Sequence, residues 1–288
     1  MKINNLNEMD NYDDIYISSH LDDVGFSCPT SILNAPKNRR ILVVTIFSEG
    51  KSADCPKFLA RQQEEHNASI QGGYDYIFAQ FNDIRKSKVI SHNGLIWSEL
   101  TETQLIESVR AWLVELFDIA KPKTVFVPIG VGRHIDHRIT HITCNEVLIN
   151  SNIEVWYYED RPYALVPQST EVFLRELGYQ VDVRFEVFLD NLFTSGFLGR
   201  SKPKVLEQRK QDYNDFVKRI ANQETTKSIK SSRFIYSDNL EQVWKIISCY
   251  KSQLKHFIGG KETFFRDCRI IAIDQGRDEV YCERQWQL

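Results

Sequence analysis

The stretch ILVVTIF, residues 41–47, decides the fold. Its residues are apolar or β-branched throughout, without alternation, and such continuous runs are typical of strands buried on both faces of a parallel sheet. Residues 14–18 (DIYIS) and 124–129 (TVFVPI) repeat this pattern. Residues 101–120, between these two runs, carry apolar side chains at helical spacing. The alternation of strand and helix predicts an α/β fold, a Rossmann-like, mostly parallel sheet with helices on both faces.

Weaker signals place the remaining elements. We expect helices at residues 24–33, 56–71 and 137–150, and strands at residues 74–81 and 153–158. Past residue 160 the pattern is mixed: it predicts a half-exposed strand at 181–189, helices at 202–220 and 239–257, and a terminal hairpin of strands 269–273 and 279–282. Because no linker or repeat interrupts the chain, we expect a single domain over residues 1–288, with a core at about 12–160 and a mixed C-terminal elaboration at about 161–288.

The composition excludes several classes of protein. With a net charge of −3 and 26% charged residues, the chain lacks the basic field that binds nucleic acids or anionic membranes. No run reaches the roughly eighteen apolar residues of a membrane-spanning helix. The amino terminus is polar, without the apolar run of a signal peptide, and the six cysteines form no C-x-x-C motif, so we expect free thiols in a cytoplasmic protein. The sequence leaves the oligomeric state open, a homo-oligomer included.

Two polar segments directly follow predicted strands. SHLDD, residues 19–23, comes after the strand at 14–18, and RHIDH, residues 133–137, comes after the strand at 124–129 and a glycine turn. In an open parallel sheet, ligands bind beyond the carboxyl ends of the strands. The two segments therefore bring three imidazoles and three carboxylates to one edge of the fold.

These residue types in this pattern indicate a metal site. Zinc hydrolases hold the ion with three ligands from His, Asp or Glu and keep water in the fourth position. His20 and Asp23 are three residues apart, a spacing that one tight turn can bring inward, and His137 is the third candidate ligand. Asp22 is then left as a general base, and His134 as a cation beside the developing oxyanion. The alternative for each segment is a helix cap with surface charges.

At these residues the sequence resembles the PIG-L/LmbE family of metal-dependent N-deacetylases. His20-Leu21-Asp22-Asp23-Val24 stands where the family has a His-Pro-Asp-Asp-Glu type motif, so Leu21 and Val24 depart from that motif. The family's His-x-Asp-His motif is intact as His134-Ile135-Asp136-His137. Arg61-Gln62-Gln63-Glu64 is similar to the family's Arg-x-x-Glu helix, and residues 158–163 and 250–253 are similar to one branch of the family. The resemblance extends from about residue 14 to 257.

The resemblance implies a role for each site residue. It implies Zn²⁺ as cofactor, with another divalent metal such as Fe²⁺ as the alternative. Arg61 would face the substrate, unless it pairs with Glu64 or Glu65 on a solvated helix face. Glu159 and Asp160 are candidates for binding sugar hydroxyls, or else they end a strand. The implied roles are metal ligands for His20, Asp23 and His137, general base for Asp22, oxyanion-stabilising acid for His134, and support of the second motif for Asp136.

We therefore expect a hydrolase that removes an acetyl or other acyl group from the amide nitrogen of an N-acetylated amino sugar or glycoside. Metal binding lowers the pKa of water to about 7, and Asp22 accepts the proton. The alternatives are a deacylase of a non-sugar N-acyl amine, a non-heme iron oxygenase with the same two-His-one-carboxylate ligands, and a catalytically silent carbohydrate-binding module. The strand–helix alternation and the extra carboxylate of Asp22 argue against the oxygenase, and the intact ligand positions argue against the silent module.

Overall fold

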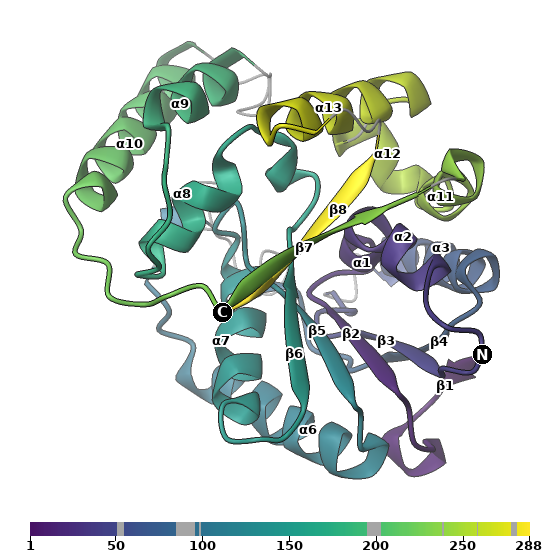
Figure 1. The fold of residues 1–288 in the computed structure, drawn as a ribbon. Helices are drawn as coiled ribbons and strands as arrows, with labels where there is room; N and C mark the ends of the chain where they lie inside the picture. The colour runs from purple at the N-terminus through teal and green to yellow at the C-terminus, as the bar shows by residue number, and fades with distance from the viewer. Residues whose placement is uncertain are drawn as a thin grey trace.

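An eight-stranded sheet runs through the part of the chain that the computed structural model describes, residues 1–50, 55–84, 96–97, 99–194, 203–237, 239–257, 259–277 and 281–288. Its strand order is β1-β4-β3-β2-β5-β6-β8-β7 (Figure 1). The strands from β1 to β6 are parallel, whereas β8 is antiparallel to both β6 and β7. The predicted mostly parallel α/β fold is confirmed. The strands are β1 (Lys2–Ile3), β2 (Asp14–Ser18), β3 (Ile41–Thr45), β4 (Asp75–Phe78), β5 (Thr124–Pro128), β6 (Glu154–Tyr158), β7 (Ser231–Tyr236) and β8 (Cys282–Gln287).

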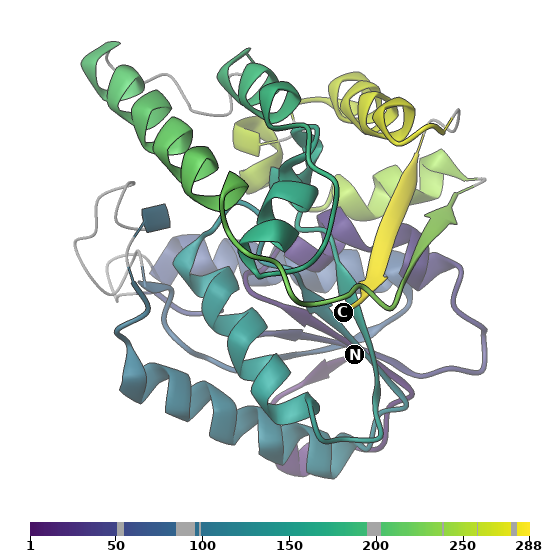
Figure 2. The ribbon, with the colours of Figure 1, turned by 60° about the vertical axis from the view of Figure 1, so that its left-hand side comes forward.

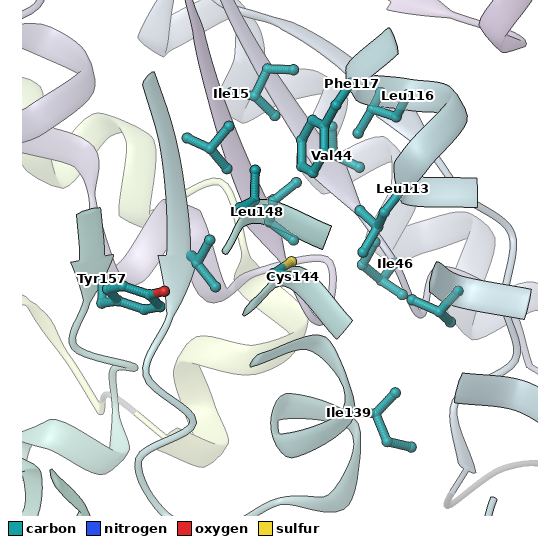
Figure 3. Close-up of a cluster of buried hydrophobic side chains, with 14 of the residues drawn as sticks. Ile15, Val44, Ile46, Leu113, Leu116, Phe117, Ile139, Cys144, Leu148 and Tyr157 are labelled. Atoms are coloured by element: carbon teal, nitrogen blue, oxygen red, sulfur yellow. The ribbon is translucent and has the colours of Figure 1, made fainter. Parts of the chain in front are cut away.

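Helices cover both faces of the sheet because alternate residues of each strand point to opposite sides. Ile15 and Val44 face α6 and α7 (Figure 3), whereas Tyr16 and Val43 face α1, α2 and α3. The helices are α1 (Asp23–Ser27), α2 (Pro29–Leu33), α3 (Cys55–Gly72), α6 (Thr103–Ala120), α7 (Ile135–Leu148), α8 (Ser169–Glu176), α9 (Phe185–Thr194), α10 (Pro203–Ala221), α11 (Leu240–Ile247), α12 (Lys251–Phe257) and α13 (Lys261–Asp274), with two short 3₁₀ turns, η1 (Leu6–Glu8) and η3 (Tyr163–Leu165).

The C-terminal half adds two apolar clusters beyond the sheet. Helices α8, α9 and α10 pack around Phe188 and Phe216, and α11, α12 and α13 pack around Tyr250 and Phe264. Both groups of helices lie beyond the end of the sheet where β2 runs into α1 and β5 runs toward α7 (Figures 1 and 2). This end holds the carboxyl termini of the parallel strands, so the additional helices stand around the predicted site.

Several expected elements differ in the structure. Residues 181–189 form no strand: α9 begins at Phe185 and buries Phe188 and Leu192, which are one helical turn apart. The apolar alternation of Val181, Val183 and Phe185 precedes this helix and produced the false period of two. The expected helix at 24–33 divides at Cys28 and Pro29 into α1 and α2, because Pro29 lacks the N–H that would continue the first helix. The helix at 239–257 likewise divides into α11 and α12.

The prediction of a terminal hairpin is wrong. Residues 269–273 lie inside α13, where Cys268, Ile271 and Ala272 are buried at helical spacing. Residues 279 and 280 of the second expected strand lie outside the described residues, and β8 starts at Cys282. β8 pairs instead with β6 and with β7, which lies about fifty residues earlier in the chain. A short apolar run does not distinguish a buried helix face from a strand, and this is why the pattern misled.

Candidate metal centre

The order of the strands in the sheet places the motifs at residues 19–23 and 133–137 side by side. β2 lies between β3 and β5, so the strand order reverses direction at the β2–β5 pair. His20 follows β2, and the loop of residues 129–134 leads from β5 into α7. Because the two strands are parallel, their carboxyl ends meet at the same edge, and the reversal point of such a sheet is where ligands bind. The structure confirms that the two motifs come together.

Three side-chain atoms converge at this edge. His20 Nδ1 lies 3.2 Å from His137 Nε2, and Asp23 Oδ2 lies 3.7 Å from the former and 3.4 Å from the latter. Ligand atoms bound tetrahedrally at about 2.1 Å from one ion lie roughly 3.4 Å apart, so these separations fit a small divalent cation. The exposed fraction is 9% for His20, 5% for Asp23 and 1% for His137. The donor set of two imidazoles and one carboxylate suits zinc or ferrous iron.

The far nitrogen of each imidazole meets a carboxylate. His20 Nε2 lies 2.9 Å from Asp136 Oδ2, and His137 Nδ1 lies 2.7 Å from Asp160 Oδ1. Such partners fix the ring orientation and leave the near nitrogen available to a metal. Burial lowers the pKa of His20, but the hydrogen bond to Asp136 and the charges of Asp23 and Asp136 outweigh burial and raise it to about 9. The same carboxylates that favour imidazolium also favour a bound cation.

Asp22, the neighbour of Asp23 in the chain, forms an ion pair with an arginine. It precedes the first residue of α1, and its Oδ1 accepts a hydrogen bond from the Arg61 guanidinium of α3 at 2.7 Å. Arg61 therefore pairs with neither Glu64 nor Glu65: Glu64 accepts from the backbone and hydroxyl of Ser252, and Glu65 accepts from two tyrosines. The predicted base is thus held by a cation beside the metal centre.

The sequence offered two roles for His134, a helix cap and a cation beside the oxyanion, and the structure is compatible with both. It is the N-cap of α7, and its Nδ1 accepts the N–H of Asp136 at 3.3 Å. Because Nδ1 accepts, the ring proton of the neutral imidazole lies on Nε2. The ring lies next to the two candidate ligands, with its centroid 5.0 Å from that of His20 and 5.6 Å from that of His137. His134 can therefore cap the helix and donate from Nε2 at the same time.

Glu159 and Asp160 are buried, and their carboxylates are taken up by the protein itself. Asp160 holds His137 through one oxygen and accepts the N–H groups of Gly130 and Val131 through the other, at 2.7 and 3.0 Å. Glu159 accepts from Arg284 Nε at 2.6 Å and from Trp286 Nε1 at 3.1 Å. This placement differs from the predicted contact with sugar hydroxyls and favours a positioning role for both residues.

Sequence reasoning missed Asp83. Its carboxylate groups with His20 and Asp136, their potential ligand atoms lying within 4.8 Å of one another, and the residue is buried. Asp83 follows β4 at the same carboxyl edge as the two motifs, and this position was the available signal. Leu21 and Val24, the two departures from the family motif, are buried in the apolar cluster beneath α1 and replace polar chemistry with packing.

Residues 15–148 match the family model described as PIG-L: GlcNAc-PI de-N-acetylase, which confirms the predicted family over this part of the chain. The matched residues contain both motifs. No curated protein matches the sequence. Within the described residues, no helix is both long enough and apolar enough to cross a membrane.

Three solved structures of similar fold are deacetylases by name. The A40926 pseudoaglycone deacetylase Dbv21 is 17% identical with a TM-score of 0.64, over 96% of this chain and 97% of its own. The zinc-inhibited form of teicoplanin deacetylase Orf2 is 16% identical with a TM-score of 0.65, over 95% and 96%. The N,N'-diacetylchitobiose deacetylase from Pyrococcus horikoshii is 13% identical with a TM-score of 0.50, over 96% and 83%. At these identities the likeness establishes the shared fold.

Proposed function

We propose that this protein is a zinc-dependent hydrolase. It removes an acetyl or other acyl group from the amide nitrogen of an N-acetylated amino sugar or glycoside. The match of residues 15–148 to the PIG-L family supports this proposal. The observation that carries this proposal is the convergence of His20 Nδ1, His137 Nε2 and Asp23 Oδ2 within 3.2 to 3.7 Å of one another. The family description and the names of the structures of similar fold support the substrate class.

His20, Asp23 and His137 would hold the metal. A divalent ion bound there would lower the pKa of a water ligand to about 7 and polarise the acyl carbonyl. His20 and His137 keep their near nitrogens turned to that position because Asp136 and Asp160 bind the far ones.

Asp22 moves the protons. Its carboxylate accepts a proton from the attacking water and passes it to the leaving amine nitrogen as the C–N bond breaks. Arg61, at 2.7 Å from Asp22 Oδ1, restrains the carboxylate during both transfers. His134 donates from Nε2 to the carbonyl oxygen as negative charge develops on it, which lowers the barrier most when the donor is already in place.

The same three ligands also suit a non-heme iron oxygenase. Asp22 has no role in that chemistry, and a second carboxylate adjacent in the chain to the candidate ligand Asp23 favours hydrolysis. The same residues would hydrolyse a non-sugar N-acyl amine, so this alternative is distinguished by measuring which substrates are hydrolysed.

Amine release from a panel of N-acetylated sugars, glycosides and non-sugar N-acyl amines tests the proposal with the zinc-loaded protein. We expect turnover of N-acetylated amino sugars and its loss after chelation, with recovery on adding zinc. Turnover confined to non-sugar amides would transfer the proposal to that substrate class. A protein that binds one metal per chain and hydrolyses no amide of the panel would contradict the proposed enzyme.

A further inference from the structure

Arg133, the residue before His134, has an uncommon backbone conformation. Its φ is +63°, and Gly132 before it has a φ of +85°, so two successive residues of the loop into α7 lie in the left-handed region. Glycine adopts this region freely, whereas the Cβ of an arginine comes close to the neighbouring carbonyl oxygen there and strains the backbone. A strained residue keeps such a conformation only where the contacts around it determine the conformation. The side chain of Arg133 supplies contacts of this kind.

The Arg133 side chain is buried, with the residue 8% exposed, and contacts three segments of the chain. Its Nε donates to the backbone oxygen of Ile96 at 3.2 Å. The guanidinium carbon lies 5.0 Å from the ring centroid of Trp97 and 4.9 Å from that of Phe216, and the guanidinium forms an ion pair with Glu176. Glu176 is the last residue of α8 and Phe216 belongs to α10. Arg133 therefore connects the loop before α7 with helices of the C-terminal half.

The loop is fixed at its other end as well. Asp160 accepts two backbone N–H groups at the start of the loop through one oxygen, and its other oxygen lies 2.7 Å from Nδ1 of His137. His134 directly follows Arg133 and caps α7 through its own Nδ1. Because Arg133 and His134 share one planar peptide group, a change in the Arg133 backbone would turn the His134 ring.

We propose that Arg133 is a positioning residue: its contacts with α8 and α10 hold the backbone that turns the His134 imidazole toward the substrate carbonyl. This inference rests on the proposed function and adds to it a residue and a role for the C-terminal helices. Arg133 acts through His134, because its own guanidinium is buried against Glu176 and two aromatic rings. A donor stabilises a developing oxyanion when it is already in place, and a misplacement of about 1 Å costs about 10²-fold in rate.

The test is a double-mutant cycle between Arg133 and His134 in the zinc-loaded protein. Arg133→Gly leaves the left-handed backbone accessible but removes every side-chain contact, so the end of the loop is released. We expect kcat for an N-acetylated amino sugar to fall by about 10- to 100-fold, with KM within about twofold of wild type and one metal still bound per chain. In the His134→Ala background the same change should cause no further loss, because the group through which Arg133 acts is already absent.

Two further variants separate positioning from folding. Arg219→Ala is the matched control, because Arg219 also pairs with Glu176, at 3.3 Å, and lies over Phe216 but is not part of the loop. Its kcat should equal that of wild type. Glu176→Gln removes the charged partner of Arg133 on α8 and should lower kcat less than Arg133→Gly does, again only when His134 is present. Thermal unfolding checks that each variant folds.

A second measurement does not depend on turnover. Asp136 donates its backbone N–H to His134 Nδ1, and it belongs to the first turn of α7, whose N–H groups have no partner within the helix. Hydrogen exchange of this N–H, followed by NMR, should be about fivefold faster in Arg133→Gly, as for the loss of a helix cap, and unchanged in Arg219→Ala. If the wild type hydrolyses no amide of the panel but this change is found, the proposed function fails and the positioning role is supported.

Other outcomes would overturn the inference. A loss in Arg133→Gly that multiplies with the loss in His134→Ala would mean that Arg133 acts independently of His134. A loss that appears in KM would place Arg133 against the substrate. Exchange of the Asp136 N–H as slow in Arg133→Gly as in the wild type would mean that Arg133 does not hold His134 and that its contacts serve folding alone.

Discussion

Asp22 and Asp23 are adjacent in the chain yet face different partners. Asp23 Oδ2 accepts the N–H of His20 at 2.7 Å and lies beside both imidazoles, whereas Asp22 turns to Arg61. α1 begins between them, and this start sends consecutive side chains in different directions. The three-residue spacing from His20 to Asp23 already favoured this assignment, because residues three apart share one side of a helical turn.

The first prediction separates these two carboxylates. Asp22→Asn removes the proton acceptor but no metal ligand, so we expect kcat to fall by about 10²- to 10⁴-fold with one metal still bound per chain. The control, Asp23→Asn, should lose the metal as well as the activity. Elemental analysis together with initial rates checks both. An active Asp22→Asn protein would exclude this residue as the base.

The second prediction concerns the double role of His134. His134→Ala removes both the helix cap and the Nε2 donor, and we expect a loss of ~1 kcal/mol in stability and about 10²- to 10³-fold in kcat. His134→Asn restores a good cap without restoring the imidazole. Its unfolding free energy should therefore return to the wild-type value while kcat stays low. Recovery of kcat in His134→Asn would mean that the cap alone matters.

At the scale of elements, Tyr250 connects α3, which carries Arg61, with α1, which follows the candidate base Asp22. The hydroxyl of Tyr250, the residue before α12, donates to Glu65 of α3 at 2.8 Å, and Glu65 lies one helical turn after Arg61. The Tyr250 ring also lies against Gly25 of α1, where a Cβ would overlap it. Tyr250 thus contacts both α3 and α1, and we expect it to set the distance between Arg61 and Asp22.

The third prediction follows from Gly25. On an exposed helix, Gly→Ala stabilises by about 1 kcal/mol, but the overlap with Tyr250 reverses the sign here. We expect Gly25→Ala to destabilise by about 1–3 kcal/mol, as overpacking does, and to weaken metal binding because Asp23 is two residues away. Tyr250→Leu in the Gly25→Ala background should recover part of both losses. A double-mutant cycle measures this coupling, and additive effects would contradict the contact.

The fourth prediction is a pH dependence. Burial raises the pKa of Glu65 to about 7, although hydrogen bonds from Tyr250 and Tyr74 lower it in part. A carboxyl whose pKa is higher folded than unfolded holds its proton in the native state, so its contribution to stability is lost as the pH rises from about 4.5 to 7. Glu65→Gln should remove this loss and gain up to ~3 kcal/mol relative to wild type between pH 5 and pH 8. Denaturant unfolding at both pH values measures it. If the difference in unfolding free energy between Glu65→Gln and the wild type were the same at pH 5 and pH 8, Glu65 would be ionised in the native state at both pH values.

At the scale of the whole molecule, the sequence predicted what depends on local patterns. The buried strands β2, β3 and β5 are visible in the sequence as continuous apolar runs, and the two motifs that follow β2 and β5 predict the candidate metal centre. β7 and β8 were not predicted, because β8 is a charged strand in the interior. Glu283 binds the N–H groups of Thr30 and Ser31, and its neighbour Arg284 binds Glu159. Those contacts join residues more than a hundred positions apart, and no local period encodes them.

A metal bound by the two motifs would also stabilise the fold as a whole. His20 and Asp23 lie where β2 leads into α1, and His137 lies in the first turn of α7, so one ion would tie together segments separated by more than a hundred residues. Asp23, Asp136 and Asp160 lie buried against the two imidazoles, and a bound cation would add positive charge where these carboxylates favour it. A ligand that binds only the folded chain stabilises it by RT ln(1 + [L]/Kd), about 3 kcal/mol at a hundredfold excess over Kd.

We therefore predict that chelation lowers the unfolding temperature by several degrees and that zinc restores it in proportion to its concentration. Since the stabilisation passes through the ligands, it should be absent in His137→Ala and Asp23→Asn, and retained in Asp22→Asn. Differential scanning calorimetry with and without chelator checks the four proteins. A zinc-dependent shift of equal size in His137→Ala would place the bound ion elsewhere on the chain. A shift in Asp22→Asn equal to that of wild type, together with its loss of activity, would separate holding the metal from using it.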